Sequence, residues 1–335
     1  MQHNHRWTKL GFCVIALAMI TAMPTGSRAA ESTELKVGIS EAVNTVLAFW
    51  MAEEGGFFRE QGLKVQILNM NGGSRGAQEL RAGRIDIMHV GLSSVVRVDR
   101  GPPGGDLRLV ASLSNVIRFT LFAEPAVRTA TDLRGGIIGI STFGSETDTT
   151  VTLALARLGL SRNDVTLKEY GGGPARLAAL KAGEIRATAV NEPMRSLARE
   201  QGFNALVDLV PEQIPWLFSG IVVKRAMLNE RRDVLTRFLK AVMEGNALAL
   251  ADEPRAKAVL AREAKITEAK IVDIAYDDFK QQSPHDIAPT ATAAANTLAQ
   301  FPPGGSAADY IDTTILDELR ASGFTAGVQR KYGIP

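Results

Sequence analysis

The feature that most constrains the fold is an internal repeat at an offset of 100 residues, with no gap. The segment LRAGRI at 80–85 returns as LKAGEI at 180–185. The recurring positions are Val65, Gly72, Gly73, Leu80, Ala82, Gly83, Ile85 and Val90, which match Val165, Gly172, Gly173, Leu180, Ala182, Gly183, Ile185 and Val190. The repeat reflects either a duplicated unit or two β-turn-α-β units whose turns both need glycine. Either origin predicts two similar lobes.

Each copy alternates strand-like and helix-like segments. In the first copy, strands are predicted at 35–40, 64–68 and 85–90, and helices at 46–54 and 77–82. In the second copy, strands are predicted at 137–141, 165–168 and 185–190, and helices at 146–158 and 176–182. This alternation is typical of a mostly parallel sheet covered by helices, so the predicted fold class is α/β.

Two apolar strand-like segments, 117–123 and 221–224, stand where the chain would cross between the lobes. The sequence then becomes helical, with helices predicted at 231–251, 254–264, 267–279 and 311–322. The predicted division is a first lobe of residues 30–118 and 222–335, which includes the C-terminal helices, and a second lobe of residues 119–221. Two lobes also suit the chain length, since single domains usually hold about 100–200 residues.

Residues 1–29 are predicted to be a secretory signal peptide. Arg6 and Lys9 precede an apolar run at 10–23, and small residues follow at 27–29. The run is shorter than the roughly 20 residues that span a bilayer, although an N-terminal membrane anchor is the alternative. Cleavage after Ala29 would place the protein in the periplasm and remove Cys13, the only cysteine, and with it any disulfide or cysteine metal site.

The signal segment also explains the net charge. It holds Arg6, Lys9 and Arg28 among the 38 basic residues and none of the 36 acidic ones, so the rest of the chain is close to neutral. Proteins that bind nucleic acid usually carry a basic patch that neutralises phosphates. The charge balance therefore predicts no nucleic-acid partner.

Four short motifs follow one another along the chain: LKVGI at 35–39, AEEGGFFREQGL at 52–63, LRAGRID at 80–86 and TDLRG at 131–135. With the export signal, this order resembles the ABC-transporter periplasmic solute-binding proteins of the nitrate, sulfonate and taurine family, which also includes proteins that bind thiamine-pyrimidine precursors. The likeness covers roughly residues 35–224. It implies a type II periplasmic-binding-protein fold with two hinge crossovers, a small-molecule ligand, and an ABC transporter permease in the inner membrane as partner.

The ligand site is expected beyond the carboxyl ends of the strands, where open α/β sheets bind their ligands. The polar residues at these ends are Asn44, Thr45, Ser93, Ser94, Asn191 and Glu192. The sequence Asn-Glu-Pro at 191–193 has an alternative explanation, a turn that Asn and Pro favour by their geometry. The resemblance implies that this segment lines the cleft, because family members often carry a polar or acidic residue before a proline there.

The loop 142–147 is the strongest candidate for ligand contact. Gly144 permits a tight turn, Ser145 is placed to cap the following helix with Asp148 as reciprocal partner, and Thr147 adds a hydroxyl group. The N-terminus of a helix favours an anionic group. The alternative is a capping box with no role in binding.

Two carboxylates complicate an anion site in this loop. Glu146 and Asp148 fall in the first turn of the predicted helix, where they would repel a bound anion. A carboxylate or neutral polar ligand, with an amine near Glu146 or Glu192, fits at least as well as nitrate or a simple sulfonate.

Further candidates lie near the predicted crossovers. Arg118 is placed to grip a carboxylate with two parallel hydrogen bonds, unless it is a surface arginine on a strand edge, and Asn115 is a similar candidate. Phe143, Trp216 and Phe218 are expected to wall the pocket, with core or hinge packing as the alternative.

The predicted function is capture of a small polar or anionic organic ligand, of the carboxylate or sulfonate class, by a monomer without cofactor or bound metal. The alternatives are a pyrimidine-precursor-related binding protein or enzyme of the same fold, and a periplasmic sensor input protein. After the signal segment only His89 and His285 remain, and His89 falls within a predicted strand, which favours packing over catalysis. The absence of a Ser-His-Asp order, a metal-ligand spacing or a phosphate loop favours binding over an enzyme.

Overall fold

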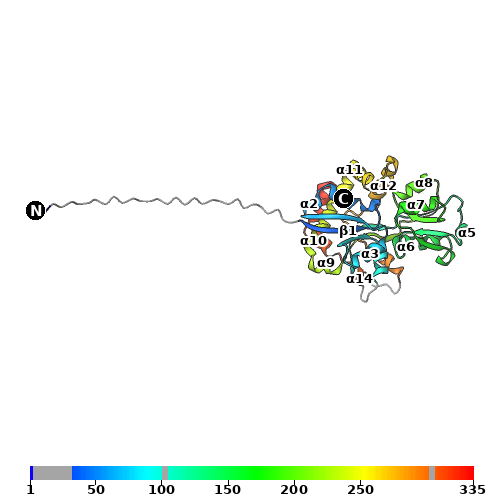
Figure 1. Cartoon of the computed structure of the whole chain (residues 1–335), viewed down its shortest axis with the longest axis horizontal. Coiled ribbons are helices and arrows are strands. Elements are labelled where there is room, and N and C mark those ends of the chain that lie inside the picture. Colours follow the sequence, from blue (N-terminus) through cyan, green and yellow to red (C-terminus); the bar gives the residue numbers. More distant parts are fainter. Residues whose placement is uncertain (3–31, 100–104, 302–305) are drawn as a thin grey trace. The chain divides into compact units, whose positions relative to one another are not determined.

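The computed structural model describes residues 1–2, 32–99, 105–301 and 306–335. The predicted signal peptide, apart from residues 1–2, lies outside the described residues. Residues 32–335 form two α/β lobes, each built on a five-stranded mixed sheet (Figure 1). Among the described helices, none is both long enough and apolar enough to cross a membrane.

The sheet of the first lobe has the strand order β2-β1-β3-β10-β4. Its strands are β1 (Thr33–Ile39), β2 (Leu63–Asn69), β3 (Ile87–Val90), β4 (Leu107–Val116) and β10 (Pro215–Lys224). The segments between them are η1 (Asn44–Val46), α1 (Leu47–Glu54), α2 (Phe57–Glu60), α3 (Gly73–Arg81) and α4 (Leu92–Val98). β1 runs parallel to β2 and β3, whereas β10 is antiparallel to both of its neighbours.

The sheet of the second lobe repeats this arrangement in the order β7-β6-β8-β5-β9. Its strands are β5 (Thr120–Ala123), β6 (Ile137–Ile140), β7 (Thr166–Glu169), β8 (Ala187–Val190) and β9 (Asn204–Asp208). The helices between them are α5 (Ala130–Leu133), α6 (Glu146–Arg157), η2 (Arg162–Asp164), α7 (Gly173–Lys181) and α8 (Met194–Glu200). β5 is antiparallel to β8 and β9 and so takes the place that β10 has in the first sheet.

The repeat seen in the sequence is therefore a repeat of structure. α3 and α7 begin and end at positions 100 residues apart, and so do β3 and β8. Parallel strands joined by helices follow from the alternating pattern, and the predicted two-lobed α/β fold is confirmed.

The chain passes between the lobes twice. It leaves the first sheet after β4 and enters the second at β5, and it returns between the end of β9 at Asp208 and the start of β10 at Pro215. The whole of β10 pairs with strands of the first sheet. We therefore propose that the second boundary lies within 209–214, earlier than the 221/222 division expected from the sequence.

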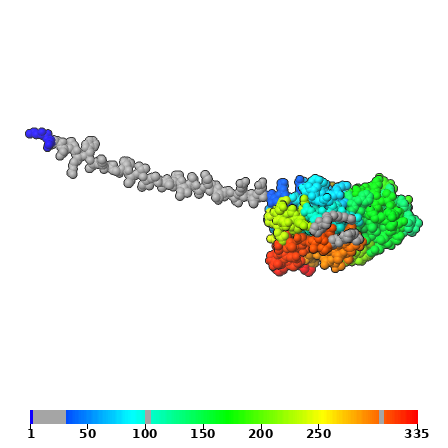
Figure 2. All heavy atoms as spheres, turned by 90° about the horizontal axis from the view of Figure 1, so that it is seen from below, coloured from blue at the N-terminus to red at the C-terminus, as the bar shows by residue number. Residues whose placement is uncertain are grey.

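The C-terminal region is helical and packs on the first lobe. Its helices are α9 (Arg225–Glu230), α10 (Arg232–Ala251), α11 (Glu253–Ala264), α12 (Ala269–Gln282), α13 (Ala291–Ala299), α14 (Ala307–Tyr310), α15 (Thr314–Ala321) and α16 (Phe324–Tyr332). Figure 2 shows the yellow-green, orange and red C-terminal segments beside the blue and cyan N-terminal ones, with the green middle of the sequence adjoining them on one side. The predictions for α10, α11, α12 and α15 agree with the structure to within a few residues, whereas α13 and α16 were not predicted.

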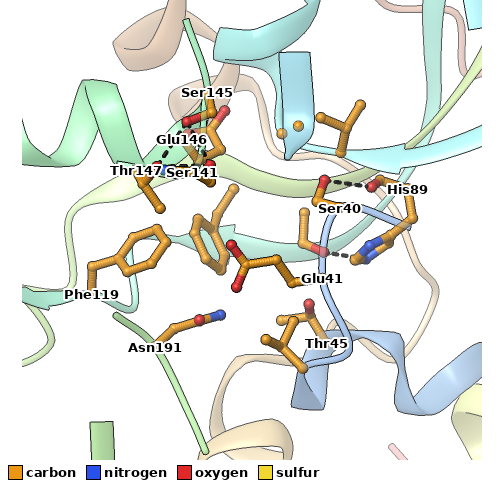
Figure 3. A pocket seen from close by; sticks show the side chains of 16 residues that line it. Ser40, Glu41, Thr45, His89, Phe119, Ser141, Ser145, Glu146, Thr147 and Asn191 are labelled. Carbon is orange, nitrogen blue, oxygen red and sulfur yellow. Dashed lines mark hydrogen bonds between the residues drawn. The ribbon is translucent and has the colours of Figure 1, made fainter. Parts of the chain in front are cut away.

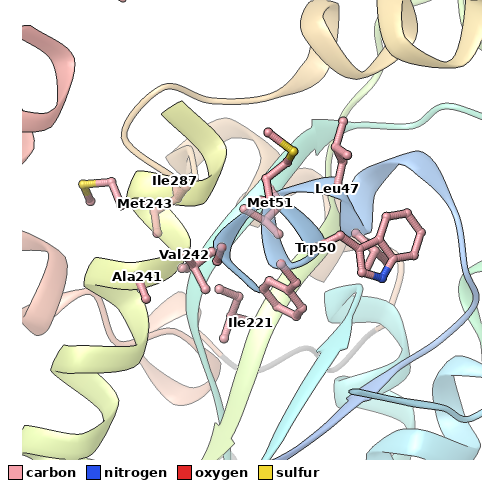
Figure 4. Packing of buried hydrophobic residues seen from close by; sticks show 14 of the residues in the cluster. Leu47, Trp50, Met51, Ile221, Ala241, Val242, Met243 and Ile287 are labelled. Atoms are coloured by element: carbon pink, nitrogen blue, oxygen red, sulfur yellow. The ribbon is translucent and has the colours of Figure 1, made fainter. Parts of the chain in front are cut away.

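The main hydrophobic core lies where α1 and α10 meet the first sheet (Figure 4). Leu47 and Met51 of α1, Val242 of α10 and Ile221 of β10 are fully buried there. Gly245 permits the close approach of the two helices, because a Cβ atom at this position would lie 2.3 Å from the backbone oxygen of Ala48. The helices α10, α11, α12, α15 and α16 thus share one core with the first sheet.

Candidate ligand-binding site

A cavity lies between the lobes and is lined by residues of both (Figure 3). The empty space within it, which includes solvent at its open side, is about 470 Å³. The lining residues are Ser40, Glu41, Val43, Thr45, Gly73, His89, Val90, Gly91, Phe119, Ser141, Ser145, Glu146, Thr147, Asn191, Phe218 and Ser219. The position agrees with the rule that ligands bind beyond the carboxyl ends of parallel strands.

The structure brings four of the predicted site residues to the cavity wall. Thr45 enters from the first lobe, and Ser145, Thr147 and Asn191 enter from the second. Phe218, which was considered for the wall, also lines the cavity and packs edge-on against Phe119 with ring centroids 5.2 Å apart. One side of the cavity therefore offers aromatic surface, and the others offer hydroxyl, amide and carboxylate groups.

The start of α6 is held by a hydroxyl cluster. Ser145 caps the helix by accepting a hydrogen bond from the backbone N–H of Asp148, as predicted. Asp148 does not complete the expected reciprocal box: its carboxylate accepts from the N–H of Gly144 at 2.7 Å and pairs with Arg162. Thr147 accepts from the N–H of Ser141 at 2.9 Å. These bonds fix the loop that faces the cavity.

Glu146 reaches across from the second lobe to the first. Its carboxylate accepts hydrogen bonds from the N–H and hydroxyl of Ser93, at 3.0 and 3.1 Å, and from Nε1 of Trp216 at 3.0 Å. Burial raises the pKa of Glu146 to about 7, while these hydrogen bonds pull it down. A Cβ atom on Gly91 would lie only 2.2 Å from Oε1 of Glu146, so a larger residue at position 91 would force the Glu146 side chain to shift when the lobes close this far.

Ser93, Ser94 and Trp216 therefore lie behind the cavity wall instead of on it. Ser93 and Trp216 bind Glu146, and Ser94 is fully buried in α4. Trp216 was predicted to wall the pocket; it lies in the hydrophobic core of the second lobe and reaches the site through Glu146.

Arg118 takes part in a buried ion cluster away from the cavity lining. Its guanidinium binds Asp278 of α12, which also accepts from Nδ2 of Asn44 at 2.9 Å and from Nη2 of Arg195 at 3.4 Å. Glu192 pairs with Arg195 at 2.9 Å and is fully buried. The guanidinium of Arg118 is thus occupied by a carboxylate of the chain itself, and the predicted grip on a ligand carboxylate has no geometric support.

The remaining predicted residues also lie off the cavity lining. Asn115 joins β4 to the C-terminal region through the carbonyl of Ala288 at 2.9 Å. Phe143 is 52% exposed, because its loop turns outward at Gly144, which has φ of 80°. Phe143 therefore does not wall the pocket, and Gly144 shapes the loop without facing the cavity.

Sequence reasoning missed several lining residues. Glu41 stands on the loop after β1 and points into the cavity (Figure 3), and its carboxylate accepts from Nη1 of Arg176 at 2.7 Å and from the N–H of Gly173 at 3.1 Å. His89 also lines the cavity, with Nε2 2.5 Å from the hydroxyl of Ser219. The signal for Glu41 was its place at a strand end, where only its neighbours Asn44 and Thr45 were chosen.

The charged groups in the cavity wall determine the electrostatic character of the site. Glu41 and Glu146 line the cavity, and no lysine or arginine is among the described lining residues. Burial lowers the pKa of His89 to about 4, so this imidazole is uncharged at neutral pH. Within the described ranges, no group of three or more His, Cys, Asp or Glu side chains is arranged to hold a metal ion. The wall therefore offers hydrogen bonds and aromatic contact without a cation for an anionic ligand.

Known proteins share this architecture. A protein from Bordetella bronchiseptica RB50 superimposes with a TM-score of 0.77 at 20% identity, over 90% of this chain and 99% of that protein. The alkanesulfonate-binding protein SsuA from Xanthomonas axonopodis pv. citri, bound to MOPS, superimposes with a TM-score of 0.67 at 21% identity, over 81% of this chain and 92% of that protein. At these identities the likeness shows the fold.

Sequence comparison adds the family. The riboflavin-binding protein RibY of Chloroflexus aurantiacus is 26% identical over 246 residues, which cover 70% of this chain and 68% of RibY. Residues 28–263 match the NMT1-like family, and this match spans well over half of the chain. The resemblance to the nitrate, sulfonate and taurine group of solute-binding proteins is confirmed. The chain belongs to the NMT1-like family.

Proposed function

We propose that this protein captures a small organic solute between its lobes and delivers it to an ABC importer. The observation that carries the proposal is a cavity lined from both lobes and closed by hydrogen bonds between them, such as those of Glu146 to Ser93. Such a cavity forms only when the lobes come together, so a ligand held by both would stabilise the closed form. The closed form then presents the surface that an importer recognises.

The setting follows from the family and from the sequence. We propose that residues 1–29 direct export to the periplasm, that the protein acts as a monomer, and that its partner is the permease of an ABC transporter in the inner membrane. The two crossovers, at 117–119 and 209–214, would serve as the hinge about which the lobes move.

The lining favours an uncharged or cationic ligand over the carboxylate or sulfonate expected from the sequence. A buried anion needs a partner charge or several donors, and the described lining holds two carboxylates and no basic side chain. The ring pair of Phe119 and Phe218 suits a planar ring, and the hydroxyl groups suit polar substituents. Riboflavin, the ligand named for RibY, has an uncharged ring system and a polyhydroxyl chain, so it is the first candidate.

Binding of riboflavin is tested by isothermal titration and by the melting temperature, in parallel with MOPS, taurine and nitrate. We expect riboflavin to bind and to stabilise the protein by about 2.7 kcal/mol at a hundredfold excess over Kd. Tighter binding of a sulfonate or of nitrate would contradict the ligand class. Recovery of riboflavin unchanged after incubation is expected of a binding protein, whereas its conversion would point to an enzyme.

Two asparagines form a matched pair for locating the site. Asn191 lines the cavity, whereas Asn115 binds Ala288 away from it. We expect Asn191→Ala to weaken riboflavin binding by about two- to tenfold, as for loss of one hydrogen bond, and Asn115→Ala to leave the Kd unchanged. Equal effects of both substitutions would place the site elsewhere.

Gly91→Ala tests the role of lobe closure. The backbone at Gly91 has φ of −73°, which suits alanine, so the added methyl group meets Glu146 only when the lobes close. Overpacking of this kind costs about 1–3 kcal/mol, and we expect riboflavin affinity to fall by about tenfold or more. Gly327→Ala is the control, since a Cβ atom at this helical position meets nothing within 4 Å. Unchanged affinity in Gly91→Ala would separate binding from closure.

A further inference from the structure

The contact between Glu41 and Arg176 has the form of an anion in an anion site. Glu41 comes from the first lobe and lines the cavity, and its side chain is 12% exposed. Both donors to its carboxylate come from the second lobe: Nη1 of Arg176 lies 2.7 Å from Oε1, and the N–H of Gly173 lies 3.1 Å from Oε2. Guanidinium and backbone N–H groups are the donors that proteins use for carboxylates, sulfates and phosphates.

Arg176 has hydrogen-bond donors that this arrangement leaves unused. Its side chain is 0% exposed, and its Nε and Nη2 atoms are buried without a hydrogen-bond partner in the described structure. Glu41 is the carboxylate that neutralises this buried charge. A buried arginine whose single counter-charge comes from the other lobe is a strong receptor for a negative group, because leaving it unpaired is costly.

The backbone beside Arg176 is shaped for the same purpose. α7 is nine residues long and begins at Gly173, so the positive end of its dipole lies beside Glu41, and the N–H of Gly173 donates to that carboxylate, whereas Pro174 has no N–H to add. A Cβ atom on Gly173 would lie 3.3 Å from Oε2 of Glu41 and 2.7 Å from Met194. Glycine at this position therefore lets the carboxylate rest directly on the helix start.

We propose that Arg176 and the start of α7 form an anion subsite of the cavity, and that Glu41 fills it from within, which makes Glu41 the residue that excludes anionic ligands. The inference rests on the proposed function for its ligand class. The site occupied by Glu41 would otherwise receive the carboxylate or sulfonate group of a ligand. The chain supplies that negative charge itself, so the cavity accepts ligands that bring none.

Removal of the Glu41 carboxylate should allow the subsite to bind anions from solution. Glu41→Ala leaves a vacancy about the size of acetate beside an unpaired guanidinium. We expect sodium acetate, relative to sodium chloride at equal ionic strength and neutral pH, to raise the melting temperature of Glu41→Ala and not that of the wild type. Acetate affinity from isothermal titration should be at least tenfold higher for Glu41→Ala than for the wild type, and methanesulfonate should behave in the same way.

Two variants separate this vacancy from a general effect of acetate. Glu41→Gln removes the charge and keeps the volume, so no room is left and no acetate response is expected. Glu41→Ala combined with Arg176→Gln keeps the vacancy without the receptor, and the response should disappear. If Glu41→Ala is poorly soluble, Glu41→Ser leaves a similar vacancy, and its refolding yield in acetate against chloride gives the same comparison.

The outcomes are decisive without knowledge of the natural ligand. An acetate response equal in wild type, Glu41→Ala and Glu41→Gln, or absent from all, would overturn the proposal, as would a response that survives loss of Arg176. Failure of riboflavin to bind the wild type would count against the proposed ligand and leave the acetate comparison intact. Tight binding of taurine or MOPS to the wild type would overturn Glu41 as the residue that excludes anions.

Discussion

Asp278→Ala is expected to lower the free energy of unfolding by about 3–5 kcal/mol, the usual cost of leaving a buried charge without its partner. Asp278 lies on α12, its side chain is 3% exposed, and it accepts hydrogen bonds from Arg118 and Arg195. Nδ2 of Asn44 at 2.9 Å and Nε2 of Gln282 at 2.8 Å complete its shell. Alanine would leave the guanidinium of Arg118, itself 2% exposed, without an ionic partner.

The change should be measured by urea unfolding and by the melting temperature, with an expected fall of about 10 °C. Asp277→Ala is the matched control, since it removes a carboxylate one position away on the exposed side of the same helix. We expect the control to remain within about 0.5 kcal/mol of the wild type. Equal losses in both variants would show that the cluster around Asp278 contributes nothing beyond the helix surface.

Glu146→Gln is expected to remove a pH dependence of stability of about 3 kcal/mol. Burial raises the pKa of Glu146 from its ordinary 4.5 to about 7 in the folded protein. The folded state therefore binds more protons than the unfolded state between these values. Its stabilising contribution is fully present below about pH 4.5 and is lost as the pH rises through about 7.

The measurement is the free energy of unfolding at pH 5 and pH 8 for the wild type and for Glu146→Gln. Glutamine keeps the shape of the side chain and does not titrate, so the variant should lose less stability between the two pH values. The buried His89, which also lines the cavity, contributes equally in both proteins and cancels in the difference. Glu184→Gln, an exposed change in the same lobe, should keep the slope of the wild type. A slope unchanged by Glu146→Gln would contradict the raised pKa.

The sequence predicted well those parts of the fold that depend on local pattern. The 100-residue repeat marks β3 and β8 as well as α3 and α7, because glycines and apolar residues at fixed spacing determine each unit. β10 was predicted only at its end, 221–224, although it begins at Pro215. Its place between β3 and β4 depends on pairing with residues about a hundred or more positions away, and no local pattern reports such pairing.

The residues of the candidate site also divide into those that a local pattern predicts and those that depend on distant partners. Thr45, Ser145, Thr147 and Asn191 follow strand ends, and the strand-end rule found them. Arg118 was expected at the cavity because its partner Asp278, 160 residues further on, gives no sign in the sequence. Isolated positions of opposite charge do not reveal which of them pair in the folded chain. Glu41 also follows a strand end and could have been chosen by that rule, but its pairing with Arg176 of the other lobe gives no sign in the sequence.

The position of β10 also sets the order in which the lobes can be completed. All five strands of the second sheet lie within 120–208, so that sheet can form as soon as this stretch of chain is available. The first sheet needs β10 between β3 and β4, and β10 begins at Pro215. Until that strand arrives, β3 and β4 have open edges that are free to pair wrongly. During synthesis from the N-terminus, the second lobe would therefore be completed before the first. The first lobe, although its strands are made first, would stay incomplete for longer and would be the lobe more exposed to aggregation.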